Sequence, residues 1–415
     1  MVPKTTPYLV SLDLGESKIC ALIAETKEGG QVEIVGKGTA THKGARKGTI
    51  IDVPATVEAI KRAVEEAEIM AGVQVERAVV GVAGPEVQSF NSRQVVAVSA
   101  KNREIGRDDI ARALDAARSV PVPAEYEILH VIPRQFAVDG RDGVTDPLGM
   151  VGSKLEADVH VVTVPLAITQ NLLNCVNRAG VEVSEMVLEP LAAGAAVLTP
   201  DEKELGVLLA DVGGGTTEFA VWRQGALALT GVVPVGGNHF TNDLAVVLKT
   251  PFQDAERLKK KAGAALQALV AEDEVVDVPL TGGRGIQPVR RRQMAEILES
   301  RAEELLSLVL DSVAREIPLS EIRAGLVLTG GGAELDGILE VAETPAGLPV
   351  RKGIPQGLGG LTDVVAGPEW SVAVGLLLHG RASSVSPRVR PRAVAGVLSN
   401  LTTRLKGLFA SSAQK

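Results

Sequence analysis

Two short segments combine aspartate, glycine and hydroxyl residues in a pattern suited to holding a phosphate chain. Asp211-Val212-Gly213-Gly214-Gly215-Thr216-Thr217 lies between two apolar runs, and Asp13-Leu14-Gly15-Glu16-Ser17-Lys18 repeats the arrangement near the N-terminus. Each pattern predicts a strand, a tight turn and a second strand. Glycine lets backbone N–H groups approach an anion closely, and an aspartate at a strand end can hold a hydrated cation. Two such turns predict two related halves that clamp one phosphate chain.

The composition limits the classes of protein to consider. A chain of 415 residues exceeds the size of one hydrophobic core, so at least two domains are expected. The aromatic content of 2% disfavours recognition of nucleic acid by base stacking, and the net charge of −8 disfavours its nonspecific binding. We therefore expect no nucleic-acid partner. No secretory signal and no apolar run of ~18 residues is present, so we expect a cytoplasmic protein.

The elements that must position the first turn begin with the strand–turn–strand unit at 8–26 and a strand at 32–38. A helix follows at 55–71, where apolar residues recur at helical spacing, and then a strand at 77–82. From 85 to 164, short alternating strands surround one helix. This change of pattern predicts a small inserted α+β module.

The second half repeats the order, with a hairpin at 206–232, a mainly helical insertion that ends in a long amphipathic helix at 290–317, and a strand at 325–329. Helices of small residues at 189–198 and 370–380 can pack closely on a neighbour, as a pivot between two halves requires. The predicted division is a first half (1–84 and 165–198) with an inserted module (85–164), a second half (199–237 and 322–380) with an inserted block (238–321), a flexible basic linker (381–393) and a terminal helix (394–415).

The C-terminal segment is basic, since residues 383–415 contain arginine and lysine but no acid. Its apolar residues recur at helical spacing and include Val397, Leu398, Leu401, Leu405, Leu408 and Phe409. An amphipathic helix after a basic linker is typical of insertion into an anionic membrane surface. The alternative is a helix docked on the body of the protein.

The order of these motifs resembles the actin/Hsp70/sugar-kinase ATPase superfamily. Neither a P-loop pattern nor a strand–GxGxxG–helix pattern is present. Within the superfamily the chain is similar to the FtsA family of bacterial actin-like cell-division proteins. This resemblance is carried by Ile128-Leu129-His130-Val131-Ile132-Pro133, Asp146-Pro147-Leu148-Gly149-Met150, Leu198-Thr199-Pro200-Asp201-Glu202-Lys203-Glu204-Leu205-Gly206-Val207, Pro234-Val235-Gly236-Gly237-Asn238 and Thr241-Asn242-Asp243-Leu244-Ala245.

The resemblance implies an α/β actin-like ATPase fold with a nucleotide cleft between the halves, and ATP with Mg²⁺ as its ligands. It implies that Asp13 and Asp211 hold Mg²⁺ through water. The implied nucleotide-binding residues are Asp13, Gly15, Glu16, Ser17, Lys18, Asp211, Gly213, Gly214, Gly215, Thr216, Thr217, Gly236, Gly237, Asn238, Glu256, Lys259, Gly330, Gly331, Gly332 and Ala333. Taken without this resemblance, Glu256 and Lys259 are typical of a solvated helix face. Glu189 either orients the attacking water or only favours a helix start. Glu16 stands where the family usually has a small hydroxyl residue, and an acid beside phosphates is repulsive unless it points to solvent.

The resemblance also implies a cell-division protein that polymerises at the inner face of the cytoplasmic membrane, at the division site. It would anchor FtsZ filaments, help to recruit later division proteins, and be at most a slow ATPase. Arg301 and Glu304 are the implied FtsZ contacts, although an i, i+3 pair is also common on helix surfaces. Two alternatives remain open on the sequence, a PilM-like pilus-assembly protein and a small-molecule kinase of the same superfamily.

Overall fold

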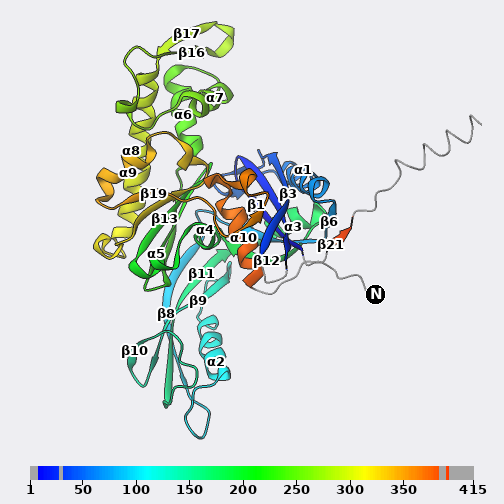
Figure 1. Cartoon of the computed structure of the whole chain (residues 1–415), viewed down its shortest axis with the longest axis vertical. Coiled ribbons are helices and arrows are strands. Elements are labelled where there is room, and N and C mark those ends of the chain that lie inside the picture. The colour runs from blue at the N-terminus through cyan, green and yellow to red at the C-terminus, as the bar shows by residue number, and fades with distance from the viewer. Residues whose placement is uncertain (1–7, 28–30, 383–388, 392–415) are drawn as a thin grey trace, which may run out of the picture.

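The computed structural model describes residues 8–27, 31–382 and 389–391, and it contains two sheets of the same topology (Figure 1). The first sheet has the order β12-β7-β1-β2-β3-β20, and the second has the order β15-β14-β13-β18-β19. In each sheet three consecutive strands pair antiparallel, and two later strands add in parallel beside the first of them. The predicted pair of related α/β halves is therefore confirmed.

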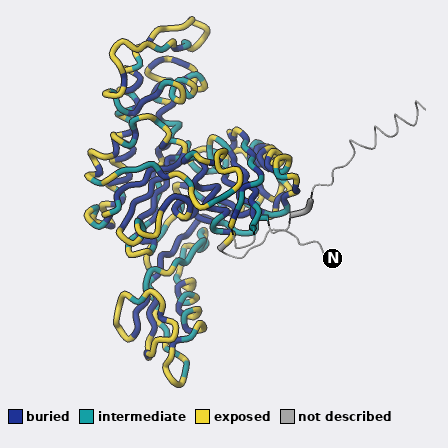
Figure 2. The backbone as a smooth tube through the Cα atoms, viewed as in Figure 1, coloured by how far each residue is buried: buried dark blue, intermediate teal, exposed yellow. Residues whose placement is uncertain are grey.

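The strand bounds show how each half begins with a hairpin. The first sheet consists of β1 (Tyr8–Leu14), β2 (Lys18–Thr26), β3 (Val32–Thr41), β7 (Arg77–Val82), β12 (Glu182–Leu188) and β20 (Gly359–Gly360). The second consists of β13 (Val207–Val212), β14 (Thr217–Arg223), β15 (Ala226–Val233), β18 (Gly325–Thr329) and β19 (Val350–Lys352). The inner strands are buried on both faces, which explains their continuous apolar runs (Figure 2).

Helices cover the first sheet on one side and separate the two sheets on the other. Helix α1 (Val53–Ala71), predicted at 55–71, starts where the side chain of Asp52 accepts from the N–H of Ala55 and ends at Gly72 in the left-handed conformation. It shares a buried core with the first sheet and with α3 (Leu166–Arg178). Helices α4 (Glu189–Val197) and α10 (Ser371–Ala382) pack on one another, and their core includes residues of both sheets.

Two segments after residue 350 differ from the sequence-based division. Strand β20 extends the first sheet beside β3, and the hydroxyl of Ser11 in β1 donates to the carbonyl of Ala373 in α10. The last part of the region assigned to the second half thus lies against the first sheet.

The first insertion is an antiparallel sheet of order β10-β9-β11-β8 with one helix, at the lower end in Figure 1. It is built from β8 (Gln88–Ala97), α2 (Arg107–Arg118), β9 (Tyr126–Val138), β10 (Arg141–Val144) and β11 (Lys154–Pro165). Strand β9 runs through Pro133 and Arg134 without a break. A register shift opposite Asp158 and Val159 accommodates the proline, so the strand does not end there.

The second insertion forms the upper end in Figure 1 and carries a hairpin that the sequence did not predict. Its helices are α6 (Gly237–Leu248), α7 (Phe252–Ala262) and α8 (Arg291–Ala314), and the hairpin is β16 (Val275–Pro279) with β17 (Ile286–Arg290). The glycine-rich segment 281–285 is the tip of this hairpin. The remaining elements are α5 (Pro200–Leu205), α9 (Ile338–Ala346), β4 (Ala45–Arg46), β5 (Thr49–Ile50), β6 (Val73–Val75) and β21 (Val389–Pro391).

The C-terminal predictions are largely outside the described residues. Within the expected linker, β21 pairs antiparallel with β6, so these three residues are ordered on the body rather than flexible as expected. The six apolar residues of the predicted membrane helix, 397 to 409, lie beyond the described part. Across the described residues, no helix combines the length and apolar character needed to cross a bilayer.

Candidate functional site

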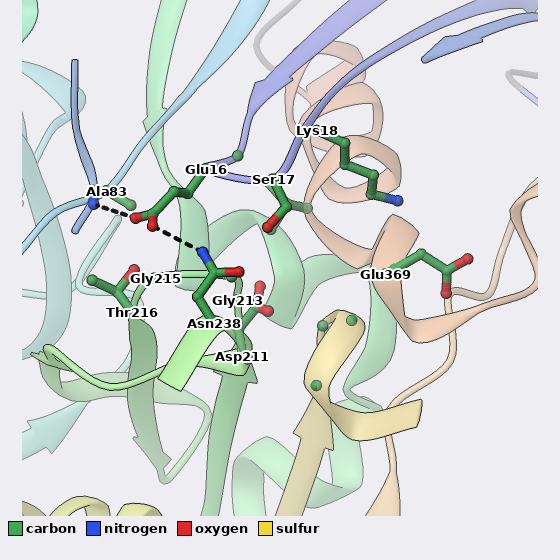
Figure 3. Close-up of a pocket in the computed structure, with 18 of the residues that line it drawn as sticks. Glu16, Ser17, Lys18, Ala83, Asp211, Gly213, Gly215, Thr216, Asn238 and Glu369 are labelled. Atoms are coloured by element: carbon green, nitrogen blue, oxygen red, sulfur yellow. Dashed lines mark hydrogen bonds between the residues drawn. The ribbon is translucent and has the colours of Figure 1, made fainter. Parts of the chain in front are cut away.

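A cavity of about 610 Å³ lies between the two halves, and both glycine turns line it. The walls come from the first and second sheets, from the beginnings of α4 and α6, and from α7 and the loop after β18. Figure 3 shows Glu16, Ser17 and Lys18 on one side of this cavity and Asp211, Gly213 and Thr216 on the other. The arrangement brings together segments that are almost two hundred residues apart in the sequence.

The first turn follows directly from the pairing of β1 with β2. Asp13 lies opposite Cys20, which leaves Gly15, Glu16 and Ser17 as the connection. His42, which the sequence analysis did not select, fixes this turn from behind. One ring nitrogen of His42 lies 2.8 Å from the carbonyl oxygen of Gly15, and its backbone N–H donates to the carbonyl of Ser17 at 3.0 Å. Its lone position in an otherwise polar stretch offers no pattern that would have identified it.

The second turn closes through a backbone hydrogen bond from Gly213 to the carbonyl of Thr216 at 3.0 Å. Its glycines bring the two turns together, since a β-carbon at Gly214 would overlap the hydroxyl of Ser17. Gly330, at φ +79°, leaves room in the same way for the carboxylate of Asp211. The glycine segment 330–332, which follows β18, therefore lies directly beside Asp211.

Most of the residues expected at a nucleotide line this cavity, and three do not. Thr217 is fully buried and donates its hydroxyl to the carbonyl of Val235 at 2.8 Å. Ala333 is buried in the core of the second half, and Gly236 packs behind the turn against Gly213. All three support the wall from behind and do not face the cavity.

Four carboxylates gather at the base of the cavity, of which Asp13, Asp211 and Glu218 are buried and Glu189 is half-buried. Burial, opposed by Lys18, raises the pKa of Asp13 to about 6, and burial raises the pKa of Glu218 to about 7. Burial and the neighbouring acids raise the pKa values of Asp211 and Glu189 well above their usual range. Such a group of acids favours a bound cation, which would stabilise their charged forms.

Glu218 was missed by the sequence analysis, although it follows the glycine turn directly. It lies opposite Asp211 in the β13–β14 ladder, and one of its buried oxygens has no hydrogen-bond partner among the described residues. An unpaired buried oxygen that lines a cavity marks a place for a ligand atom or water. Within the described residues, no three acidic, histidine or cysteine side chains are grouped as direct metal ligands.

Glu256 and Lys259 do not form the solvated helix face that their sequence suggested when read alone. The Lys259 ammonium lies 2.7 Å from a Glu256 carboxylate oxygen and donates to the carbonyl of Gly237 and the hydroxyl of Thr241, both at 2.8 Å. Glu256 accepts from the hydroxyl of Thr241. This network ties α7 to the beginning of α6 at the edge of the cavity.

A second hollow, of about 390 Å³, lies between α6 and α8 in the upper insertion. It is lined by Asn242, Asp243, Val246, Val247, Ile297, Ser300, Arg301 and Glu304. Arg301 donates two hydrogen bonds to the Asp243 carboxylate, at 2.6 and 3.0 Å, and pairs with Glu304. Val246 is 67% exposed beside these charges. The two residues implied as partner contacts thus border an apolar groove.

Comparison with known proteins identifies the family. A family model described as cell division protein FtsA matches residues 208–375, and one described as an SHS2 domain inserted in FtsA matches residues 84–163. The cell division protein FtsA of Pseudomonas aeruginosa is 44% identical over 372 residues, which cover 90% of this chain and 89% of that protein. The FtsA of Bacillus subtilis is 40% identical over 368 residues, 89% of this chain and 82% of that protein.

Solved structures support the fold at much lower identity. A PilM-PilN type IV pilus biogenesis complex matches with a TM-score of 0.66 and 17% identity, over 90% of this chain and 98% of that chain. MreB 5 of Spiroplasma citri bound to AMPPNP matches with a TM-score of 0.56 and 16% identity, over 92% and 98%. At these identities the similarity concerns the fold alone. One of the two structures, that of MreB 5, contains a bound nucleotide analogue.

Proposed function

The chain belongs to the FtsA family of cell-division proteins, and on this premise we propose that it binds ATP with Mg²⁺ between its actin-like halves and joins FtsZ filaments to the membrane. The further parts of the proposal are that it polymerises and helps to recruit later division proteins. Identities of about 40% to FtsA proteins favour this function over the PilM-like alternative, which shares the fold at 17% identity. They also disfavour a small-molecule kinase.

The observation that carries the nucleotide proposal is the pair of glycine turns facing one cavity, with an aspartate at each strand end. Backbone N–H groups of Gly15–Lys18 and Gly213–Thr216 would surround the phosphates, while Gly330, Gly331 and Gly332 leave room on another wall. Asp13 and Asp211 would hold the cation through water, and the cation would offset the negative charge of the phosphates.

Glu189 is proposed to orient water, and its surroundings favour slow hydrolysis at most. Desolvation in the cavity, and then the neighbouring Asp13, Glu218 and Asp211, raise its pKa. A raised pKa lowers the fraction of this side chain that is a carboxylate able to accept a proton from water. A cation bound nearby would lower the pKa again.

Asp211→Ala tests the nucleotide site. We expect ATP affinity in the presence of Mg²⁺ to fall at least about tenfold by calorimetry, because the variant removes a buried carboxyl group that would support the cation. Asp201→Ala, which removes an exposed acid from α5, is the matched control and should bind as the wild type does. Equal affinities for the two variants would remove Asp211 from this role.

The groove between α6 and α8 is proposed as the FtsZ contact, with Arg301 and Glu304 at its border. An apolar groove flanked by charges suits an extended peptide that carries both apolar and charged residues. Val246→Asp should abolish co-sedimentation with FtsZ filaments, because it places a charge on the apolar side. Ile69→Asp, at a similarly exposed site on α1, should leave it unchanged. Loss of binding in both variants, or in neither, would contradict this location.

The membrane contact is proposed for the C-terminal helix on its sequence pattern. The basic residues before it and the apolar residues along it favour reversible binding, which polymerisation would strengthen through avidity. A chain that ends at Gly380 should no longer sediment with vesicles containing anionic lipids, whereas the full chain should. Equal sedimentation of both forms would refute this part of the proposal.

A further inference from the structure

We infer that Glu16 competes with the terminal phosphate of a nucleoside triphosphate, and that this carboxylate determines how well the cleft distinguishes triphosphate from diphosphate. The inference rests on the proposed nucleotide site and concerns its regulation. An acid at position 16 avoids repulsion from bound phosphates only if its side chain points to solvent.

In the structure Glu16 points across the cleft instead. Its Oε1 accepts a hydrogen bond from the side-chain amide of Asn238 at 2.9 Å, and its Oε2 accepts one from the backbone N–H of Gly48 at 3.3 Å. Figure 3 shows the carboxylate beside Asn238, with Gly215 and Thr216 next to them. Asn238 belongs to the second half and Glu16 to the first, so this contact links the halves.

The place that the carboxylate occupies is shaped for an anion. Gly215 forms one wall, and a β-carbon there would overlap the carboxylate of Glu16. Asn238 is the second residue of α6, whose N-terminal end favours negative charge. A side-chain amide, a backbone N–H and a helix N-terminus therefore converge on one point, and the chain fills it with its own acid.

A terminal phosphate held by the Gly213–Thr216 turn needs the same space and the same donors. Two anions cannot share them without repulsion, so Glu16 has to leave before a triphosphate is fully seated. Its departure breaks the link to Asn238 between the halves. A diphosphate lacks the competing group and leaves the carboxylate in place. Triphosphate binding is thereby coupled to opening of this link.

The test compares affinities for ADP and for a non-hydrolysable ATP analogue, measured by calorimetry on the full chain with Mg²⁺. Glu16→Ser removes the competitor, and Glu16→Gln removes its charge while keeping its size. The control Glu65→Ser removes an exposed acid from α1 in the same half. Thermal unfolding of each variant establishes that it is folded.

We expect Glu16→Ser to bind the ATP analogue at least about tenfold more tightly than the wild type, a gain of about 1.4 kcal/mol, and to change ADP affinity less than about threefold. Glu16→Gln should show part of this increase in affinity for the ATP analogue, and Glu65→Ser should show none. If the wild type binds both nucleotides and Glu16→Ser leaves the ratio of their affinities unchanged, the inference is wrong and the proposed function stands. If no folded variant binds either nucleotide, the proposed function itself fails.

Discussion

Replacing Gly375 by alanine should force apart the two helices at the centre of the molecule. Gly375 in α10 lies against the backbone of Ala192 in α4, so that a β-carbon at this position would be 1.8 Å from the carbonyl oxygen of Ala192 and 3.0 Å from its Cα. Those atoms belong to a helix backbone and cannot rotate away. The helices would have to separate by at least about 1 Å to restore van der Waals contact.

The size of the effect follows from two opposing contributions. Alanine favours a helix over glycine by about 1 kcal/mol, whereas overpacking a filled core costs about 1–3 kcal/mol and more when backbone has to move. The core around this crossing includes residues of both sheets, so little of the strain can be relieved locally. We expect Gly375→Ala to lower the free energy of unfolding by about 2 kcal/mol.

Gly380→Ala is the matched control in the same helix. A β-carbon at 380 would meet a methyl group of Val79 at 3.0 Å, and a side chain can adjust. Urea unfolding followed by circular dichroism should give a lower midpoint for Gly375→Ala than for the wild type, and an unchanged or higher midpoint for Gly380→Ala. Equal midpoints for the two variants would refute the idea that close helix crossing requires glycine at 375.

Three further predictions concern pH, ligand and charge. Burial lowers the pKa of His160 to about 4, so on acidification the unfolded chain binds a proton before the folded chain does. The free energy of unfolding therefore falls as pH drops below about 6.5, and at pH 5.5 the loss is about 1.4 kcal/mol. The urea midpoint of His160→Gln should therefore fall less between pH 7.5 and 5.5 than that of the wild type. An equal fall in both proteins would contradict this role of His160. ATP with Mg²⁺ at about a hundred times its Kd should stabilise the wild type by about 2.7 kcal/mol in thermal unfolding, and an equal shift in Asp211→Ala would contradict the proposed site. Lys259→Met should weaken ADP binding about tenfold or more, because it removes charged hydrogen bonds at the cavity edge, whereas Lys61→Met, at an exposed lysine of α1, should not; equal losses would show that only net charge matters.

Much of the fold could be predicted because it depends on local patterns. The apolar runs around Asp13 and Asp211 predict buried strands, the glycines between them predict turns, and helical spacing predicts α1 within two residues of its start. The family follows from the same motifs and their order. Local backbone preference and the periodicity of apolar residues are properties of a short segment, so they are visible before the chain folds.

Which residues line the cavity depends on contacts between segments that are distant in the sequence. Thr217 belongs to the motif but points into the core, because side chains alternate between the two faces of a strand. His42 and Glu218 became relevant only when pairing of strands placed them behind and beside the turns. The sequence by itself determined that two glycine turns carry aspartates and that an acid stands at position 16. Only the packing of one half against the other decided that Glu16 reaches Asn238, since a side chain's partner depends on which distant backbone lies within its reach.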